Sequence, residues 1–146
     1  MSKPANPVEI TDNLPDQTIQ RSNTDNAPRS AIHQTLYSAD TFAQHDYLAG
    51  KNLPDIARPQ EGQIDWLHFV GINDVVLLKH ALEPYGIHEL VIEDILSRKQ
   101  RPKIEDYGSY VFTAAQVYHY TSTGKLHSDQ VYVIIGKDFV LSFQQK

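Results

Sequence analysis

Alternating and continuous runs of apolar residues predict several β-strands in this chain. Residues 64–70 (IDWLHFV) alternate so that one strand face would be well buried and the other mostly so. Residues 110–120 alternate in the same way, and residues 32–39 form a shorter strand-like stretch. Residues 130–135 are apolar on both faces, which predicts a central strand, and residues 139–143 return as a strand after a turn.

The segment between residues 71 and 97 changes to a helical period. Apolar residues recur at three- and four-residue steps from Val75 to Tyr85, Asn73 or Asp74 can cap the start of this helix, and Gly86 can end it. Residues 40–62 are rich in turn-forming residues, and their pattern predicts no element. The first 30 residues are polar and aperiodic, so we expect a flexible leader before a domain at residues 31–146.

A second, short helix is predicted at residues 90–96, and it contains two adjacent acids. On a helical wheel one broad apolar arc is formed by Leu90, Val91, Ile92, Ile95 and Leu96. Asp94 falls inside this arc, about 40° from Leu90 at 100° per residue, whereas Glu93 lies in the polar gap. A carboxylate among apolar neighbours needs a hydrogen-bond donor, a basic side chain or a cation as its partner. Alternatively, Asp94 lies at the solvated edge of the arc or caps a nearby loop.

Composition and missing motifs exclude several classes of function. The chain has 146 residues, about one domain, and its net charge of −5 argues against a nucleic-acid partner. It has no cysteine, so a disulfide framework or thiolate metal site is excluded, and its seven histidines include no helical i,i+4 pair. Nucleotide-binding glycine motifs and a serine nucleophile motif are absent as well, so the sequence does not indicate an enzyme. No apolar run approaches the ~18 residues that span a bilayer.

Residues 88–103 (HELVIEDILSRKQRPK) resemble the signature of the cytosolic N-terminal domain of the CorA family of magnesium and cobalt transport proteins. The matching motif positions are His88, Leu90, Val91, Glu93, Asp94, Ile95, Leu96, Gln100, Arg101, Pro102 and Lys103. Glu89 stands where the family usually has proline, a mild departure in the first turn of a helix. Two further blocks, before and after this motif, extend the resemblance over roughly residues 62–146.

The resemblance implies an α/β fold in which short helices pack on a mixed sheet, as in the α/β/α sandwich of that family's N-terminal domain. It also implies that this chain stops before the stalk and transmembrane helices, so that one face of the sheet is partly bare. Family members are homopentameric channels without enzymatic activity or an organic cofactor. In them, the acids matching Glu93 and Asp94 hold a regulatory divalent cation, Mg²⁺ or Co²⁺, together with a neighbouring subunit.

We therefore expect a soluble domain on the cytoplasmic side of the cell (inner) membrane. By itself this domain should be monomeric or associate weakly. It would be joined to the membrane only through C-terminal helices outside this sequence. The alternatives are the same domain of a ZntB-type zinc transporter, or a free-standing α/β binding module.

The basic run at Arg98, Lys99, Arg101 and Lys103 has two interpretations. It could pair with anionic lipid or with acids of a neighbouring subunit, or it could be a solvated helix exit.

Overall fold

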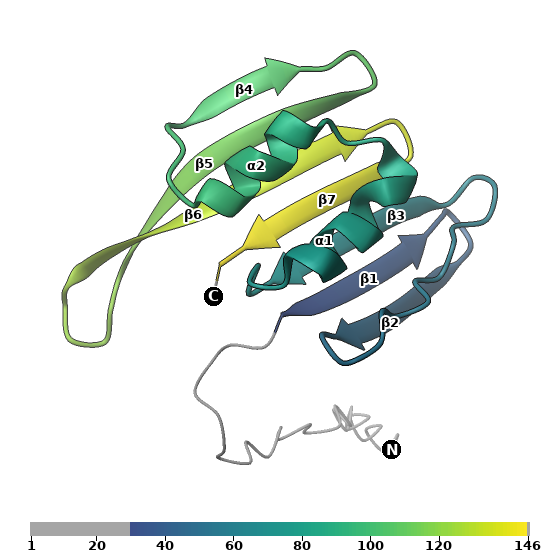
Figure 1. The fold of residues 1–146 in the computed structure, drawn as a ribbon, viewed down its shortest axis with the longest axis horizontal. Helices are drawn as coiled ribbons and strands as arrows, with labels where there is room; N and C mark the ends of the chain where they lie inside the picture. The colour runs from purple at the N-terminus through teal and green to yellow at the C-terminus, as the bar shows by residue number, and fades with distance from the viewer. Residues whose placement is uncertain (1–29, 146) are drawn as a thin grey trace, which may run out of the picture.

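In the computed structural model, residues 30–145 are described, and they form one seven-stranded sheet (Figure 1). The strands lie in the order β2-β1-β3-β7-β6-β5-β4. Their bounds are β1 (Ala31–Tyr37), β2 (Phe42–Leu48), β3 (Ile64–Val70), β4 (Lys103–Asp106), β5 (Tyr110–Tyr120), β6 (Leu126–Gly136) and β7 (Phe139–Gln144). All neighbouring strands are antiparallel except β3 and β7, which are parallel, so the sheet is mixed as expected. The predicted leader, residues 1–30, lies outside the described residues apart from Ser30.

Two short helices and one 3-10 turn follow β3, and they lie on one face of the sheet (Figure 1). They are α1 (Val75–Leu82), η1 (Glu83–Tyr85) and α2 (Glu89–Ser97). Of the two predicted caps for α1, Asp74 is the one used, because its carboxylate accepts a hydrogen bond from the Leu77 amide at 2.9 Å. Gly86 ends η1 with a φ of 62°, a left-handed conformation that glycine adopts without steric cost. The expected α/β class with short helices on a mixed sheet is confirmed.

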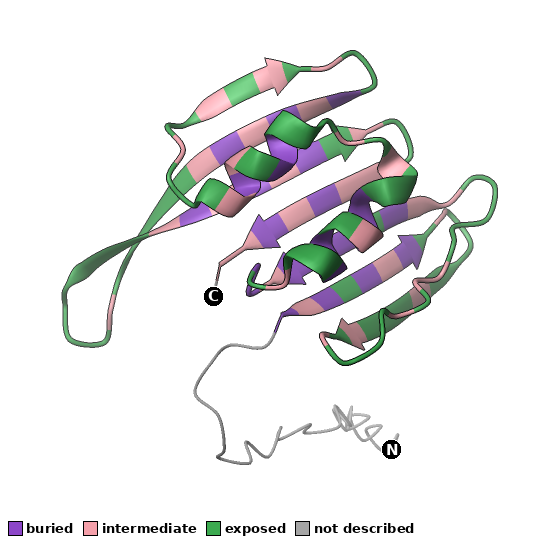
Figure 2. Cartoon of the chain, viewed as in Figure 1, coloured by how far each residue is buried: buried purple, intermediate pink, exposed green. Residues whose placement is uncertain are grey.

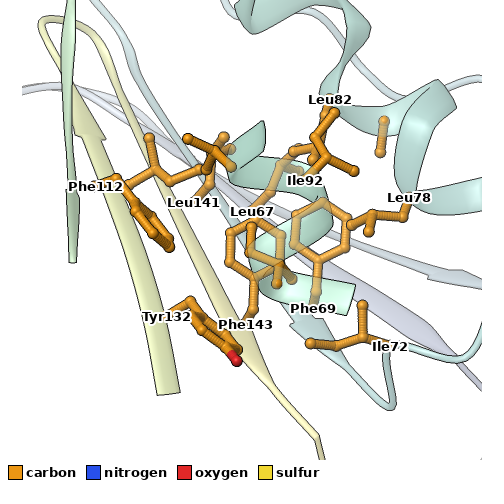
Figure 3. Packing of buried hydrophobic residues seen from close by; sticks show 14 of the residues in the cluster. Leu67, Phe69, Ile72, Leu78, Leu82, Ile92, Phe112, Tyr132, Leu141 and Phe143 are labelled. Carbon is orange, nitrogen blue, oxygen red and sulfur yellow. The ribbon is translucent and has the colours of Figure 1, made fainter. Parts of the chain in front are cut away.

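The hydrophobic core fills the space between these helices and the sheet. Buried positions alternate with more exposed ones along the central strands (Figure 2). Side chains from β3, β7, β6 and β5 meet those of α1 and α2, and the Phe69 and Phe143 rings stack with centroids 4.7 Å apart (Figure 3). On the opposite face no described helix packs, and Trp66 and Ile135 remain exposed there. This single helical layer agrees with the expectation of a partly bare sheet face.

Two strands were not predicted from the pattern, and both lie at an edge of the sheet. Strand β2 falls in the turn-rich region, and none of its residues is fully buried, because only one neighbour and no helix covers it. Strand β4 has four residues, too few to establish an alternating pattern. The predicted strand at residues 32–39 ends earlier, at Tyr37. Strand β6 is internal, as predicted, but it begins at Leu126 and forms with β5 a two-stranded ribbon that extends beyond the rest of the sheet (Figure 1).

A buried polar network ties the sheet to the helical layer. The Asp65 side chain is almost fully buried, and its two oxygens accept hydrogen bonds from Gln34 Nε2 at 2.9 Å and from the Tyr85 hydroxyl at 2.5 Å. The Gln34 amide oxygen in turn accepts from the Tyr47 hydroxyl at 3.0 Å. Burial, together with the hydrogen bond to Asp65, raises the pKa of Tyr85 far above its usual value. A buried carboxylate is stable here because each of its oxygens has a donor.

Replacing Tyr85 with Phe removes one of the two donors to Asp65. We expect the free energy of unfolding to fall by about 1–3 kcal/mol, because a buried charged acceptor loses its hydrogen bond. Urea unfolding followed by circular dichroism measures this change. The matched control is Tyr120→Phe, which removes an exposed hydroxyl and should have no effect. Equal stability of the two variants would contradict a structural role for the network.

Tyr132 presents the opposite case, because its buried hydroxyl has no hydrogen-bond partner among residues 30–145. Burial, aided by the negative charge of Asp94, raises the pKa of Tyr132 to about 12. In the unfolded chain this hydroxyl ionises near a pKa of about 10. The contribution of this group to the free energy of unfolding is therefore fully present below about pH 10, the unfolded-state pKa. It is lost as the pH rises toward the folded-state pKa of about 12.

We expect Tyr132→Phe to leave the free energy of unfolding at neutral pH unchanged or to raise it by up to about 1 kcal/mol. Between about pH 10 and 12 the variant should lose less stability than the parent chain. The reason is that it lacks the Tyr132 hydroxyl, whose pKa differs between the folded and unfolded states. Urea unfolding at several pH values tests both statements. A clear loss of stability at neutral pH would show that the hydroxyl has a partner.

Candidate functional site

The candidate site is built on α2, which the sheet and the caps hold in place. The imidazole Nδ1 of His88 accepts a hydrogen bond from the Leu90 amide at 3.2 Å, and the His88 amide donates to the Tyr110 hydroxyl at 2.9 Å. The buried face of α2 consists of Val91, Ile92 and Ile95. These contacts fix the rotation of the helix about its own axis and therefore decide where its acids point.

That rotation corrects one part of the predicted apolar arc. Leu90 was placed in the arc, but its side chain is 58% exposed, because the buried face is centred between Val91, Ile92 and Ile95. Asp94 consequently lies at one edge of the buried face rather than inside it. Glu93 is fully on the solvent side, beside Leu90.

Asp94 has two partners from the segment that follows α2. Its Oδ2 lies 2.6 Å from Lys103 Nζ, and its Oδ1 accepts a hydrogen bond from Gln100 Nε2 at 2.9 Å. Lys103 Nζ also lies 3.1 Å from Glu105 Oε1 and 5.5 Å from the centre of the Phe112 ring. The bond to Asp94, opposed by partial burial and supported by Glu105, raises the pKa of Lys103. The sequence required a partner for Asp94, and the structure supplies both a donor and a basic side chain.

Glu93 differs from its neighbour in having no hydrogen bond or ion pair of its own within residues 30–145. The pKa of Lys79 in α1 is raised, mainly by its 2.8 Å bond to Glu89. The negative charge of Glu93 contributes a smaller part of this rise from a distance. The two acids of the motif therefore present one paired carboxylate at 24% exposure and one unpaired, exposed carboxylate.

The other motif positions have identifiable structural roles. The backbone N–H and C=O of Gln100 are both hydrogen bonded to the side chain of Gln130, at 3.0 and 2.7 Å. Lys103 begins β4, and Arg101 and Pro102 are exposed between Gln100 and this strand. These contacts place the residues after the helix against its C-terminal end, where Gln100 and Lys103 reach Asp94.

Sequence reasoning missed Gln100 and Lys103 as partners of Asp94, because they follow it by six and nine residues, beyond the spacing of one helix face. It also missed a cross-strand pair, His119 and His127, whose rings lie 5.3 Å apart near Asp129. Among the described residues, no group of three or more histidines and acids is arranged to hold a metal ion. A cation bound by Glu93 or Asp94 would thus need further ligands from outside this group.

Comparison with known proteins covers the segment that contains this site. The model of the family described as "CorA-like Mg2+ transporter protein" matches residues 61–146, more than half of the chain. The cobalt/magnesium transport protein CorA of Thermotoga maritima is 40% identical over 82 residues, which is 56% of this chain and 23% of that protein. The putative metal ion transporter YfjQ of Bacillus subtilis is 33% identical over 104 residues, covering 68% of this chain and 30% of that protein.

Solved structures show the same fold at low sequence identity. The CorA magnesium transporter from Methanocaldococcus jannaschii superposes with a TM-score of 0.57 at 10% identity, over 77% of this chain and 31% of that one. The full-length CmaX protein gives a TM-score of 0.54 at 14% identity, over 85% and 37%. The chain thus spans only about a quarter to a third of the length of the curated relatives it matches. Within residues 30–145, no helix is long and apolar enough to cross a membrane. The extent of the family match, which includes the whole acidic motif, shows that the chain belongs to the CorA-like Mg²⁺ transporter family.

Proposed function

We propose that this chain is the cytosolic regulatory domain of a CorA-type transporter of magnesium and cobalt, and that α2 contributes half of a divalent-cation site. The observation that carries the proposal is the state of the two motif acids. Asp94 pairs with an ammonium group at the edge of the helix, and Glu93 beside it is exposed and has no ion pair among the described residues 30–145. The second half of the site would come from acids of a neighbouring subunit in a homopentamer, on the cytoplasmic side of the membrane.

The donor set suits a hard cation. Mg²⁺ binds oxygen ligands, retains several of its waters, and is commonly held by only one or two protein carboxylates. Lys103 Nζ at 2.6 Å from Asp94 Oδ2 is itself a cation at this carboxylate, so the position favours positive charge. Glu93 and Asp94 cannot complete the coordination of Mg²⁺, which supports a site shared with waters and a second subunit.

Regulation follows from electrostatics at such an interface. Acids of two subunits that face each other repel, and a divalent cation between them offsets the repulsion and favours the assembled, closed arrangement. When the cation is depleted, the repulsion returns and the closed arrangement loses its advantage. In this chain Lys103 would have to release Asp94, in whole or in part, when the cation binds there.

The first prediction is that Mg²⁺ binds the isolated chain weakly and through Asp94. Amide chemical shifts of α2 in a ¹⁵N-labelled sample should move as Mg²⁺ is added at constant ionic strength, and Asp94→Asn should abolish most of the movement. Asp40→Asn removes an exposed acid far along the chain from α2 and serves as the matched control. Tight stoichiometric binding that survives Asp94→Asn would refute the assignment.

The second prediction concerns competition between Lys103 and the cation. Lys103→Met keeps a long apolar side chain but removes the ammonium, so Mg²⁺ affinity should increase, by up to about fivefold for a partly exposed ion pair of at most about 1 kcal/mol. Lys125→Met, which removes an exposed positive charge from the turn between β5 and β6 instead, should leave the affinity nearly unchanged. A weaker affinity in Lys103→Met would mean that Lys103 positions Asp94 and does not compete.

A further inference from the structure

The segment that leaves α2 lines an open surface cavity whose charge is opposite to that of the acidic motif. Residues 98–102, here called the basic loop, line a cavity of about 330 Å³ together with Gln116 of β5 and Gln130 of β6. Gln116 and Gln130 are paired across the two strands, at the base of the projecting ribbon. The volume is near the lower end of the range for small-molecule sites, about 300–1,000 Å³.

The charge of this cavity is uncompensated. Three cations line it, Arg98, Lys99 and Arg101, and its lining includes no carboxylate. Lys99 and Arg101 are exposed and have no hydrogen bond or ion pair within the part of the chain that is described. In contrast, Lys79 and Lys103 are both paired with acids. A concentration of free positive charge in a chain of net charge −5 produces a local potential that attracts anions.

The backbone of the basic loop is anchored, so its cations are held in one region. Gln130 is 8% exposed, and its side chain bonds both backbone groups of Gln100. Arg98 caps α2 in the left-handed conformation, with a φ of 57°. One nitrogen of its guanidinium donates to the Ile72 carbonyl at 3.3 Å and to Asn73 Oδ1. These contacts hold the backbone of the basic loop in a fixed position beside the cavity.

We propose that the basic loop binds a phosphate-bearing anion. A guanidinium presents a planar fork of donors that matches phosphate oxygens, a lysine supplies a point charge, and the Gln116 amide can donate beside them. The carbonyl end of α2 would by itself repel an anion, and the three cations offset that partial charge. Asp94 does not line the cavity, and its two oxygens are bonded to Lys103 and Gln100. This site is separate from the divalent-cation site and of opposite sign.

The test measures pyrophosphate binding to the full chain by calorimetry at constant ionic strength, with chloride as the competing anion. The test variant is Lys99→Ala/Arg101→Ala, and the matched control is Lys125→Ala/Lys137→Ala, which removes two positive charges from exposed positions outside the cavity. We expect one site per chain and a loss of affinity of about tenfold or more in the test variant only, as two charge-assisted contacts are removed. Thermal unfolding should be alike in both variants, since none of the four side chains has a hydrogen-bond or ion-pair partner within residues 30–145.

Two arms distinguish the source of the phosphate. Inorganic phosphate represents a free anion, and sedimentation with phosphatidylglycerol vesicles, compared with phosphatidylcholine vesicles, represents a lipid head group. Binding in either arm that depends on Lys99 and Arg101 supports the site and identifies its source. Absence of binding to pyrophosphate, phosphate and anionic vesicles alike would overturn the proposal. So would equal losses in the two double variants, because the effect would then come from net charge alone.

Discussion

The parallel pairing of β3 with β7 is the constraint on which the arrangement of this domain depends. It joins two antiparallel groups, β2-β1-β3 and β7-β6-β5-β4, into one sheet. A parallel neighbour cannot be reached by a tight turn, so the chain must cross over between the two strands. The connection from β3 to β7 contains α1, η1 and α2, followed by β4, β5 and β6, and it places the three helical elements on the same face of the sheet (Figure 1). The position of α2 above β5 and β6 follows from this connection.

The same crossover brings the two ends of the family motif together. Helix α2 ends above the sheet, and the chain must then descend to the sheet edge, where β4 pairs with β5. Lys103 is the first residue of β4, and its register opposite Ala114 puts it on the face that α2 covers. The Asp94 carboxylate at the edge of the helix therefore meets an ammonium group that belongs to the sheet. The pairing of the Asp94 carboxylate with its counter-charge thus results from one change of direction in the backbone.

The features predicted from sequence were those set by local periodicity. Strand β3, helix α1 with a cap at Asn73 or Asp74, and the internal position of β6 all depend on residues a few positions apart, where the pattern is direct. Strand β2 was not predicted because an edge strand with no fully buried residue lacks a clear alternating pattern of apolar residues. Leu90 was misplaced because a helical wheel gives the width of an apolar arc but not which part of it the sheet covers. The family resemblance supplied the fold and the motif acids, yet the partners of Asp94 required the turn that returns Lys103 to the helix.

Gln100 connects the two charged regions at the end of α2. Its side-chain amide donates to Asp94 and to Ser97, at 2.9 and 3.0 Å, while its backbone is bonded to Gln130 at the floor of the cavity beside the basic loop. A cation that draws Asp94 away from these donors would free the amide of a residue that also fixes the basic loop. Any such effect has to be reciprocal, because a coupling free energy between two sites acts equally in both directions. If a cation at Asp94 changes the affinity of the basic loop for an anion by some factor, an anion at the basic loop would change the affinity of Asp94 for the cation by the same factor.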